Sequence, residues 1–141
     1  MVKPNDHTTN YTDTFIEVAE DTKAVERQAP PPKDTPTVAQ LHYTLLTEHP
    51  YTLTSDDLLF AVHVRRQGIA DEDREAERRR FFSKGQPCLR SSPLGKTYGW
   101  GTHHDADGKV ALYAVDSADY ERLSNDPTLR HVRAMRSSRA K

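Results

Sequence analysis

The 141 residues of the sequence match the length of one ordinary domain, because domains usually have about 100–200 residues. Hydrophobic residues make up 35% of the chain and charged residues 29%, so the sequence predicts a small core. The 20 basic and 21 acidic side chains nearly cancel, and this balance argues against a wholly disordered chain. We therefore interpret residues 1–141 as a single domain.

The apolar runs are too short for a membrane span, which needs about 20 apolar residues. The longest are Leu58–Val62 and Val110–Val115. The N-terminus is polar and acidic, without the basic start and apolar stretch of a secretory signal. Cys88 is the only cysteine, so the chain forms no internal disulfide. These features predict a cytoplasmic protein with no membrane partner.

The charges are distributed unevenly along the chain. Residues 1–60 carry a balance of −6, and residues 61–141 carry a balance of +5. Two stretches, 78–104 and 127–141, contain basic but no acidic side chains. A basic region of this kind favours an anionic partner through long-range attraction, whereas a solvated face with a basic tail at 137–141 is the alternative.

The N-terminal region predicts one strand followed by a linker. Residues 1–8 are expected to be disordered, and residues 11–19 are expected to form a strand because β-formers dominate them. Residues 21–36 contain four prolines, which fix φ and donate no hydrogen bonds to a sheet. This segment is therefore expected to be an extended surface connection.

Three helices are expected next. Thr37 is a candidate N-cap for a helix that ends at Pro50. A second helix starts at Ser55 and ends at Gly68, with acids in its first turn and arginines in its last. A third helix runs from about 71 to 83, again with acids first and bases last.

The C-terminal half predicts a β-hairpin, a short helix and a last strand. Asp107-Gly108 is a strong turn signal between two β-rich runs within 96–115. Ser117 is expected to cap a short helix, after which residues 129–135 form a strand that returns beside the hairpin by a right-handed crossover. We expect an α+β fold, with a mainly antiparallel sheet of about four strands and three to four helices on one face.

Several long blocks of the sequence resemble one family. The blocks are His7–Tyr11, Asp13–Ala19, Tyr51–Asp57, Phe82–Arg90, Tyr98–Gly101, Gly108–Tyr113 and Ala134–Ser137. In these blocks the chain resembles a family of small bacterial and fungal proteins catalogued as a domain of unknown function, over nearly all residues beyond the first six. The resemblance implies no activity and supplies no catalytic residues, so function has to be argued from the side chains themselves.

A glycine-rich strand with aromatic residues is one part of the candidate site. Gly99 and Gly101 remove two side chains from one face of the strand, and glycine inside a strand marks a bulge or the close approach of another group. That group is either a ligand held over the backbone and stacked by Tyr98 or Trp100, or an aromatic ring of the protein such as the Phe81–Phe82 pair.

The neighbouring segment 84–96 is expected to form a basic loop suited to an anion, because arginine offers a fork of donors and lysine a point charge. Its candidate ligand-binding residues are Lys84, Arg90, Ser91, Ser92 and Lys96. The glycine spacing is not that of a Walker loop. We expect this segment and the glycine strand to border one cavity that binds a nucleotide, a phosphate-containing metabolite or single-stranded nucleic acid, with Arg133 or Arg136 contributing.

Two other functions are left open by the sequence. Cys88 lies among basic residues, which favour the reactive thiolate, and His103 or His104 is a candidate base, so a thiol enzyme is one alternative. A homodimer that pairs through the sheet edge and the basic tail is the other. Adjacent histidines point to opposite faces of a strand, and Asp105 and Asp107 are explained by the turn, so no metal site is predicted and no cofactor is identified.

Overall fold

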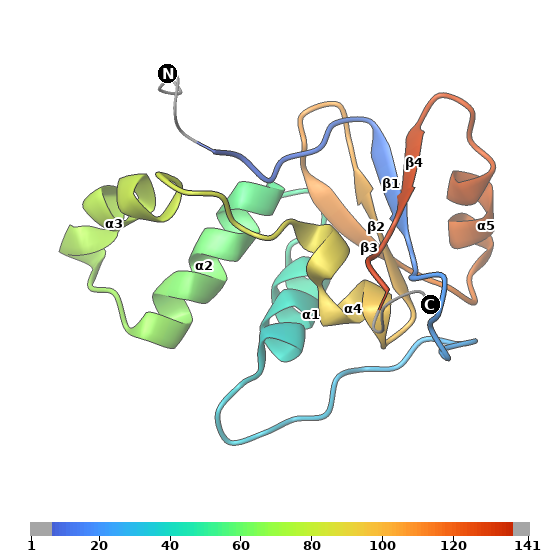
Figure 1. Cartoon of the computed structure of the whole chain (residues 1–141). Helices are drawn as coiled ribbons and strands as arrows, with labels where there is room; N and C mark the ends of the chain where they lie inside the picture. Colours follow the sequence, from blue (N-terminus) through green and yellow to red (C-terminus); the bar gives the residue numbers. More distant parts are fainter. Residues whose placement is uncertain (1–6, 137–141) are drawn as a thin grey trace.

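A four-stranded sheet forms the centre of the structure, a computed structural model that describes residues 7–136 (Figure 1). The strands are β1 (Thr14–Glu17), β2 (Trp100–His104), β3 (Val110–Ala114) and β4 (Arg130–Arg133), in the spatial order β3-β2-β1-β4. The β1–β2 and β2–β3 pairs are antiparallel, whereas β4 runs parallel to β1. The α+β class is confirmed, but the sheet is mixed where the sequence predicted mainly antiparallel pairing.

The chain crosses the whole sheet between β3 and β4. After β3 it forms α5 (Ala118–Ser124) and then pairs with β1 at the far edge, not beside the hairpin as the sequence predicted. The outer edge of β3 is already partly occupied by the segment before the second helix. There Val110 donates its backbone N–H to the Leu53 carbonyl, and Thr54 forms a bridge with Lys109. The segment that contains Leu53 and Thr54 thus takes the place beside β3 that the last strand was expected to fill.

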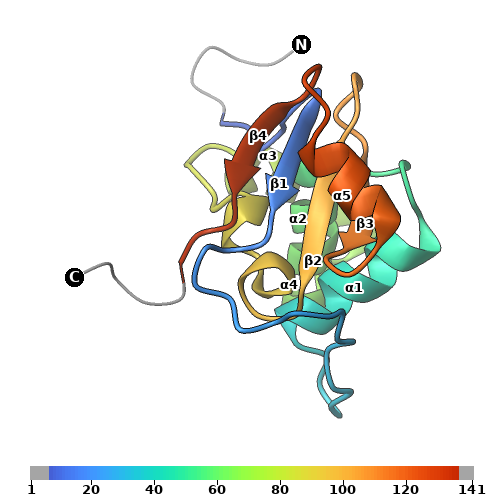
Figure 2. The same cartoon turned by 90° about the vertical axis from the view of Figure 1, so that its right-hand side faces the viewer.

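Helices cover both faces of the sheet, whereas the sequence predicted them on one. The helices of the first face are α1 (Val38–Glu48), α2 (Ser55–Gln67), α3 (Arg74–Phe81) and α4 (Pro93–Lys96), with α2 and α3 extending away from the sheet beyond α1. Figure 2 shows α5 in front of the opposite face. The described residues form five α-helices in place of the expected three to four, with two short 3-10 helices, η1 (Asp71–Asp73) and η2 (Leu89–Ser91).

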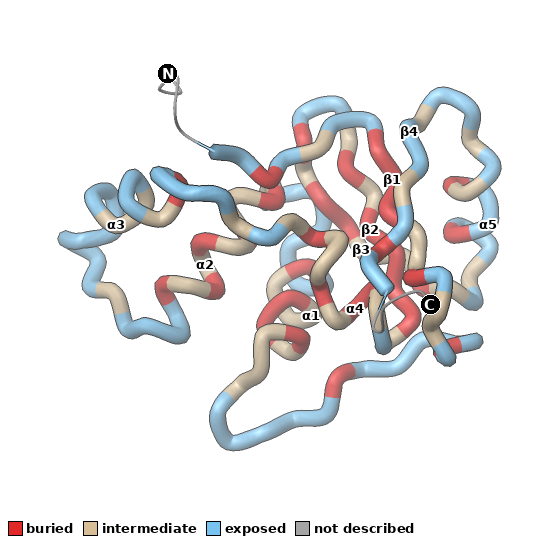
Figure 3. The backbone as a smooth tube through the Cα atoms, viewed as in Figure 1, coloured by how far each residue is buried: buried red, intermediate tan, exposed pale blue. Residues whose placement is uncertain are grey.

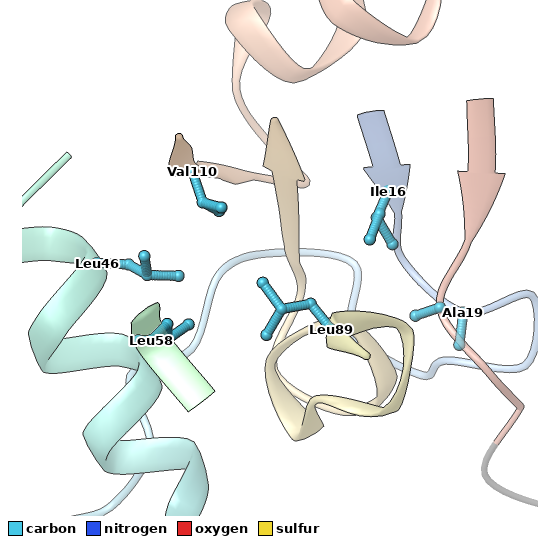
Figure 4. Close-up of a cluster of buried hydrophobic side chains, with 7 residues drawn as sticks. Ile16, Ala19, Leu46, Leu58, Leu89 and Val110 are labelled. Atoms are coloured by element: carbon cyan, nitrogen blue, oxygen red, sulfur yellow. The ribbon is translucent and has the colours of Figure 1, made fainter. Parts of the chain in front are cut away.

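The strand β1 carries apolar side chains on both faces, which explains why helices pack on both. Ile16 belongs to the main cluster of buried side chains (Figure 4). This cluster also contains Leu46, Leu58, Leu89 and Val110. The preceding residue, Phe15, points to the opposite face and packs against Tyr120 and Leu123 of α5. Figure 3 shows that burial is concentrated around the sheet and α1, whereas α3 contains no buried residue.

The predicted helix ends are largely confirmed. Thr37 caps α1, and its side chain accepts from a backbone N–H of the first turn. The second helix runs from Ser55 to a left-handed Gly68 with φ of 64°, a conformation that suits glycine. Its N-cap is Thr54, whose side chain and backbone exchange hydrogen bonds with Asp57 in a capping box. The third predicted helix is divided into η1 and α3.

The basic segment 84–96 is partly helical, although the sequence indicated a loop. It contains η2 and α4, and Ser92 caps α4 by accepting from the backbone N–H of Leu94. Pro93 occupies the first helical position, where its missing N–H costs nothing. Leu89 and Leu94 are consequently buried, and Ser92 between them is buried as well.

The proline-rich segment 21–36 forms neither helix nor strand and contacts the start of β2. The backbone N–H of Gln28 donates to the Tyr98 carbonyl at 2.9 Å. The Trp100 indole donates to the Gln28 carbonyl at 3.0 Å. The segment therefore covers the start of β2.

The two predicted terminal features fall largely outside the described residues. Of the region 1–8, residues 1–6 are not described, whereas His7 donates its backbone N–H to the Phe82 carbonyl at 2.9 Å. The basic tail 137–141 also lies outside the described part of the chain. None of the helices formed by residues 7–136 has the length and apolar character needed to span a bilayer.

Candidate functional site

The backbone at Gly101 is covered by the protein's own rings. A Cβ atom at this position would lie 2.8 Å from Phe15 Cζ and 2.8 Å from Tyr120 Cε2. The two rings pack edge to face, with their centroids 5.0 Å apart. A ligand over this backbone would have to displace both rings. The group that packs on Gly101 is therefore an aromatic pair of the protein itself, Phe15 and Tyr120, and not the Phe81–Phe82 pair that the sequence suggested.

The neighbouring residues of the glycine strand are also packed. Gly99 has a φ of 82°, and a Cβ there would lie 2.8 Å from the carbonyl oxygen of Glu26. Trp100 is 9% exposed and its indole N–H is used by Gln28, so its ring is not free to stack on a ligand. Tyr98 packs against the same hydrophobic cluster as Trp100.

Three of the predicted cations, Arg90, Arg133 and Arg136, line one groove along β4, whereas Lys84 and Lys96 do not. The Nε atom of Arg90 donates to the Arg133 carbonyl at 2.6 Å, and both residues line a groove of about 540 Å³ along β4. Arg136 lines the same groove, 3.3 Å from the carboxylate of Glu20. Glu17 is a second carboxylate in this groove. Two acidic side chains therefore offset much of the positive charge that would attract an anion there.

The predicted base partners of Cys88 lie elsewhere. The Cys88 sulfur is 3.3 Å from the hydroxyl oxygen of Tyr11, and burial together with this contact raises the Tyr11 pKa to about 12. His104 is fully buried, bonds to Thr102 at 3.1 Å, and packs its ring edge to face with Tyr11. Burial lowers the pKa of His104 to about 4. Tyr11 thus lies between Cys88 and His104.

His103 points to the opposite face of β2, as expected for adjacent strand residues. Its Nδ1 atom is 2.8 Å from the hydroxyl oxygen of Tyr51, which in turn is 2.6 Å from the hydroxyl of Tyr113. Burial lowers the pKa of His103. Asp105 accepts the backbone N–H of Asp107 at 2.9 Å, so its carboxylate stabilises the hairpin turn.

A cavity of about 290 Å³ lies between α1, α2 and the segment 86–93, and we call it the α1–α2 cavity. Its apolar lining consists of Val38, Leu59, Val62, Phe81, Pro87 and Pro93. Among the predicted residues, Ser91, Ser92 and Cys88 line it, whereas Lys84, Arg90, Lys96 and the glycine strand do not. Polar side chains from α1 and α2 complete the lining.

His42 of α1 is the most deeply buried polar residue of the cavity. It is 3% exposed, and its Nδ1 atom lies 2.9 Å from Ser92 Oγ. Its other ring nitrogen, Nε2, is buried and has no hydrogen-bond partner among the described residues. Burial lowers the pKa of His42 to about 4, so the ring is neutral at pH 7.

The last turns of α2 contribute His63, Arg66 and Gln67 to the cavity. Arg66 is exposed and has no carboxylate within ion-pair distance in the part of the chain that the structure describes. It is therefore the uncompensated positive charge of the cavity. His63 is held by Glu77 of α3 through an Nε2–Oε2 distance of 2.7 Å, and this bond lowers the pKa of the Glu77 carboxyl.

The α3 helix is anchored against α2 by a few polar and aromatic contacts. Arg78 donates to the Asp57 carboxylate at 3.0 Å, and its guanidinium carbon lies 5.5 Å from the ring centres of Phe60 and Phe82. The Gln86 side chain donates to the carbonyl of Phe81 at 2.7 Å. These contacts place the end of α3 and the start of segment 86–93 beside α2.

The sequence carried a signal for this cavity that our sequence-based site did not include. Leu59, Val62, His63 and Arg66 follow the spacing i, i+3, i+4 and i+7, which places them on one face of a helix. Val38 and His42 are one turn apart on the preceding helix. Each of these two helix faces combines apolar residues with a histidine, which indicates that the two histidines lie near one cavity. The pattern does not indicate which loop forms the remaining wall of that cavity.

No curated protein matches the sequence, and no solved structure does. A family model matches residues 6–140, and its description is Family of unknown function (DUF6157). The match confirms the resemblance seen in the sequence blocks and covers nearly the whole chain. The chain therefore belongs to the DUF6157 family.

Proposed function

We propose that the protein binds a small organic anion in the α1–α2 cavity. The sequence predicted an anionic ligand at segment 84–96, and this segment forms one wall of the cavity through Ser91 and Ser92. The positive charge comes from α2 in place of the segment's own cations. The observation that carries the proposal is that Arg66 lines the cavity and has no carboxylate partner within residues 7–136.

The size and lining of the cavity support a small ligand with an apolar body. Its volume of about 290 Å³ is just below the roughly 300–1,000 Å³ typical of ligand pockets. Six apolar side chains line it beside a few polar groups, which is the usual composition of small-molecule sites. These features favour a compact organic acid over a nucleotide or a single-stranded nucleic acid.

The groove along β4 is the competing location for an anion. It contains three arginines, but Glu17 and Glu20 share it, and Arg136 already pairs with Glu20. A ligand carboxylate would be repelled by both acids at short distance. This comparison favours the α1–α2 cavity.

Ligand-observed NMR with benzoate tests the proposal. In Arg66→Gln we expect benzoate to bind about two- to fivefold more weakly, a modest effect because an exposed guanidinium is screened by solvent. The matched control is Arg65→Gln, which removes a charge from the same helical turn but does not line the cavity. Equal benzoate affinity in both variants, or a loss caused instead by Arg133→Gln, would contradict the proposal.

The thiol enzyme and the homodimer stay predictions. Cys88 lines the α1–α2 cavity, and its hydrogen-bond partner in the described chain is the hydroxyl of Tyr11.

A further inference from the structure

The hydrogen bonds of Ser92 determine which nitrogen of His42 carries the proton. Ser92 Oγ accepts the backbone N–H of Leu94 at 3.3 Å, as the N-cap of α4. The hydroxyl hydrogen is then free to be donated, and His42 Nδ1 lies 2.9 Å away. With this assignment the Leu94 N–H and the Ser92 O–H are both satisfied. In the opposite tautomer the ring would donate to Ser92, and the serine hydrogen would have no acceptor among the residues that the structure describes.

A neutral imidazole whose Nδ1 accepts a hydrogen bond carries its proton on Nε2. This Nε2–H is the buried atom of His42 that has no partner among the described residues. A buried N–H without an acceptor is costly, and native structures normally supply one. His42 lines the α1–α2 cavity, so a molecule that displaces the atoms now covering Nε2 can supply the acceptor that the described residues lack.

We propose that the Nε2–H of His42 recognises an oxygen of the ligand, so that the cavity selects a small monocarboxylate with an apolar body. The inference rests on the proposed function, because it concerns the same cavity. One carboxylate oxygen accepts from His42, the charge is balanced by Arg66, and the body of the acid contacts apolar residues such as Leu59 and Val62. Ser92 is a positioning residue that holds the tautomer.

The tautomer is measurable on the ligand-free full-length protein. A long-range ¹H–¹⁵N spectrum of the histidine side chains distinguishes a protonated Nε2 from a protonated Nδ1. The loss of one set of signals in His42→Phe identifies His42 among the seven histidines. We expect protonated Nε2 and unprotonated Nδ1 at pH 7. The reverse pattern, or a charged ring, overturns the inference without reference to any ligand.

Acetophenone separates the donor from the charge, because its carbonyl is an acceptor but it carries no charge. We expect His42→Phe to weaken acetophenone and benzoate about tenfold, and His42→Gln, which returns an N–H donor, to restore part of the affinity. Arg66→Gln should affect benzoate only. The thermal unfolding midpoint of each variant controls for folding.

The outcomes distinguish the inference from the function on which it rests. Suppose that benzoate binds more weakly to Arg66→Gln than to the wild type and yet binds equally to the wild type and His42→Phe. In that case the proposed anion site stands and the role of His42 is refuted. If the folded wild-type protein binds neither probe, the ligand class and the proposed function are both refuted, whatever the tautomer. Should His42→Phe fail to fold, ethylbenzene provides the comparison in the wild type, because it is uncharged like acetophenone, keeps the ring and lacks an acceptor oxygen. Ethylbenzene binding as strong as that of acetophenone overturns the inference.

Discussion

Replacing Gly101 with alanine tests whether the glycine strand is packed by the protein's own rings or open to a ligand. The added Cβ would lie 2.8 Å from both Phe15 and Tyr120, closer than carbon atoms approach without displacement. Overfilling a packed core costs about 1–3 kcal/mol. Alanine offsets about 0.4–1 kcal/mol of this cost by restricting the unfolded chain. We therefore expect Gly101→Ala to lower the free energy of unfolding by about 1–2 kcal/mol.

Gly85→Ala is the matched control, because the nearest atom to its added Cβ is the Nδ1 atom of His7 at 3.9 Å. This variant should be unchanged or slightly more stable. Urea unfolding followed by the fluorescence of Trp100, the only tryptophan, measures both free energies. If Gly101→Ala unfolds at the same urea concentration as Gly85→Ala, the rings yield freely and the strand is as open as the sequence hypothesis required.

Three further predictions concern stability and the thiol. The pKa values of His42 and His104 are about 4 in the folded chain and about 6.5 when unfolded, so the unfolded state takes up more protons as pH falls through this range. The contribution of these two histidines to the free energy of unfolding should be complete above pH 6.5 and should decline toward pH 4, by at most about 3 kcal/mol for each histidine. Urea midpoints that do not fall between pH 7 and pH 4.5 would contradict this prediction. Thr54→Ala removes the capping box of α2 and should cost about 1 kcal/mol in urea unfolding, whereas Thr52→Ala on the exposed turn should cost little. Benzoate should slow the alkylation of Cys88 by iodoacetamide in the wild type more than in Arg66→Gln, because Cys88 and Arg66 line one cavity. If the Cys88 thiol reacts only after the protein unfolds, the thiol enzyme is excluded.

Local signals predicted most of the individual elements. The caps at Thr37 and Ser117, the terminal Gly68 and the turn at Gly108 all satisfy or redirect backbone groups within a few residues. Such signals act wherever the segment lies in the fold, so they are visible in the sequence. The helical content of segment 84–96 was missed because η2 and α4 are each only one turn long.

The sequence pointed to only some of the residues that line the α1–α2 cavity. Segment 84–96 does contribute Ser91, Ser92 and Cys88 to this cavity, but its cations do not line it, and Arg90 is bonded to the Arg133 carbonyl. The glycine strand was expected on the same cavity and instead is filled by Phe15 and Tyr120. Charge and glycine patterns indicate which residue types are present, but they do not say which side chains face each other.

By itself the sequence determined the family, the α+β class, the helix caps and the hairpin, because each of these depends on residue patterns or on neighbours along the chain. Only the tertiary structure decided that β4 pairs with β1, that α5 covers the second face, and that His42 meets Ser92 across a separation of 50 residues. Those arrangements depend on which surfaces bury each other, and the main cluster joins side chains from α1, α2, η2, β1 and β3. Burial of that kind is a property of the assembled chain, since no single segment can exclude water from its own apolar face.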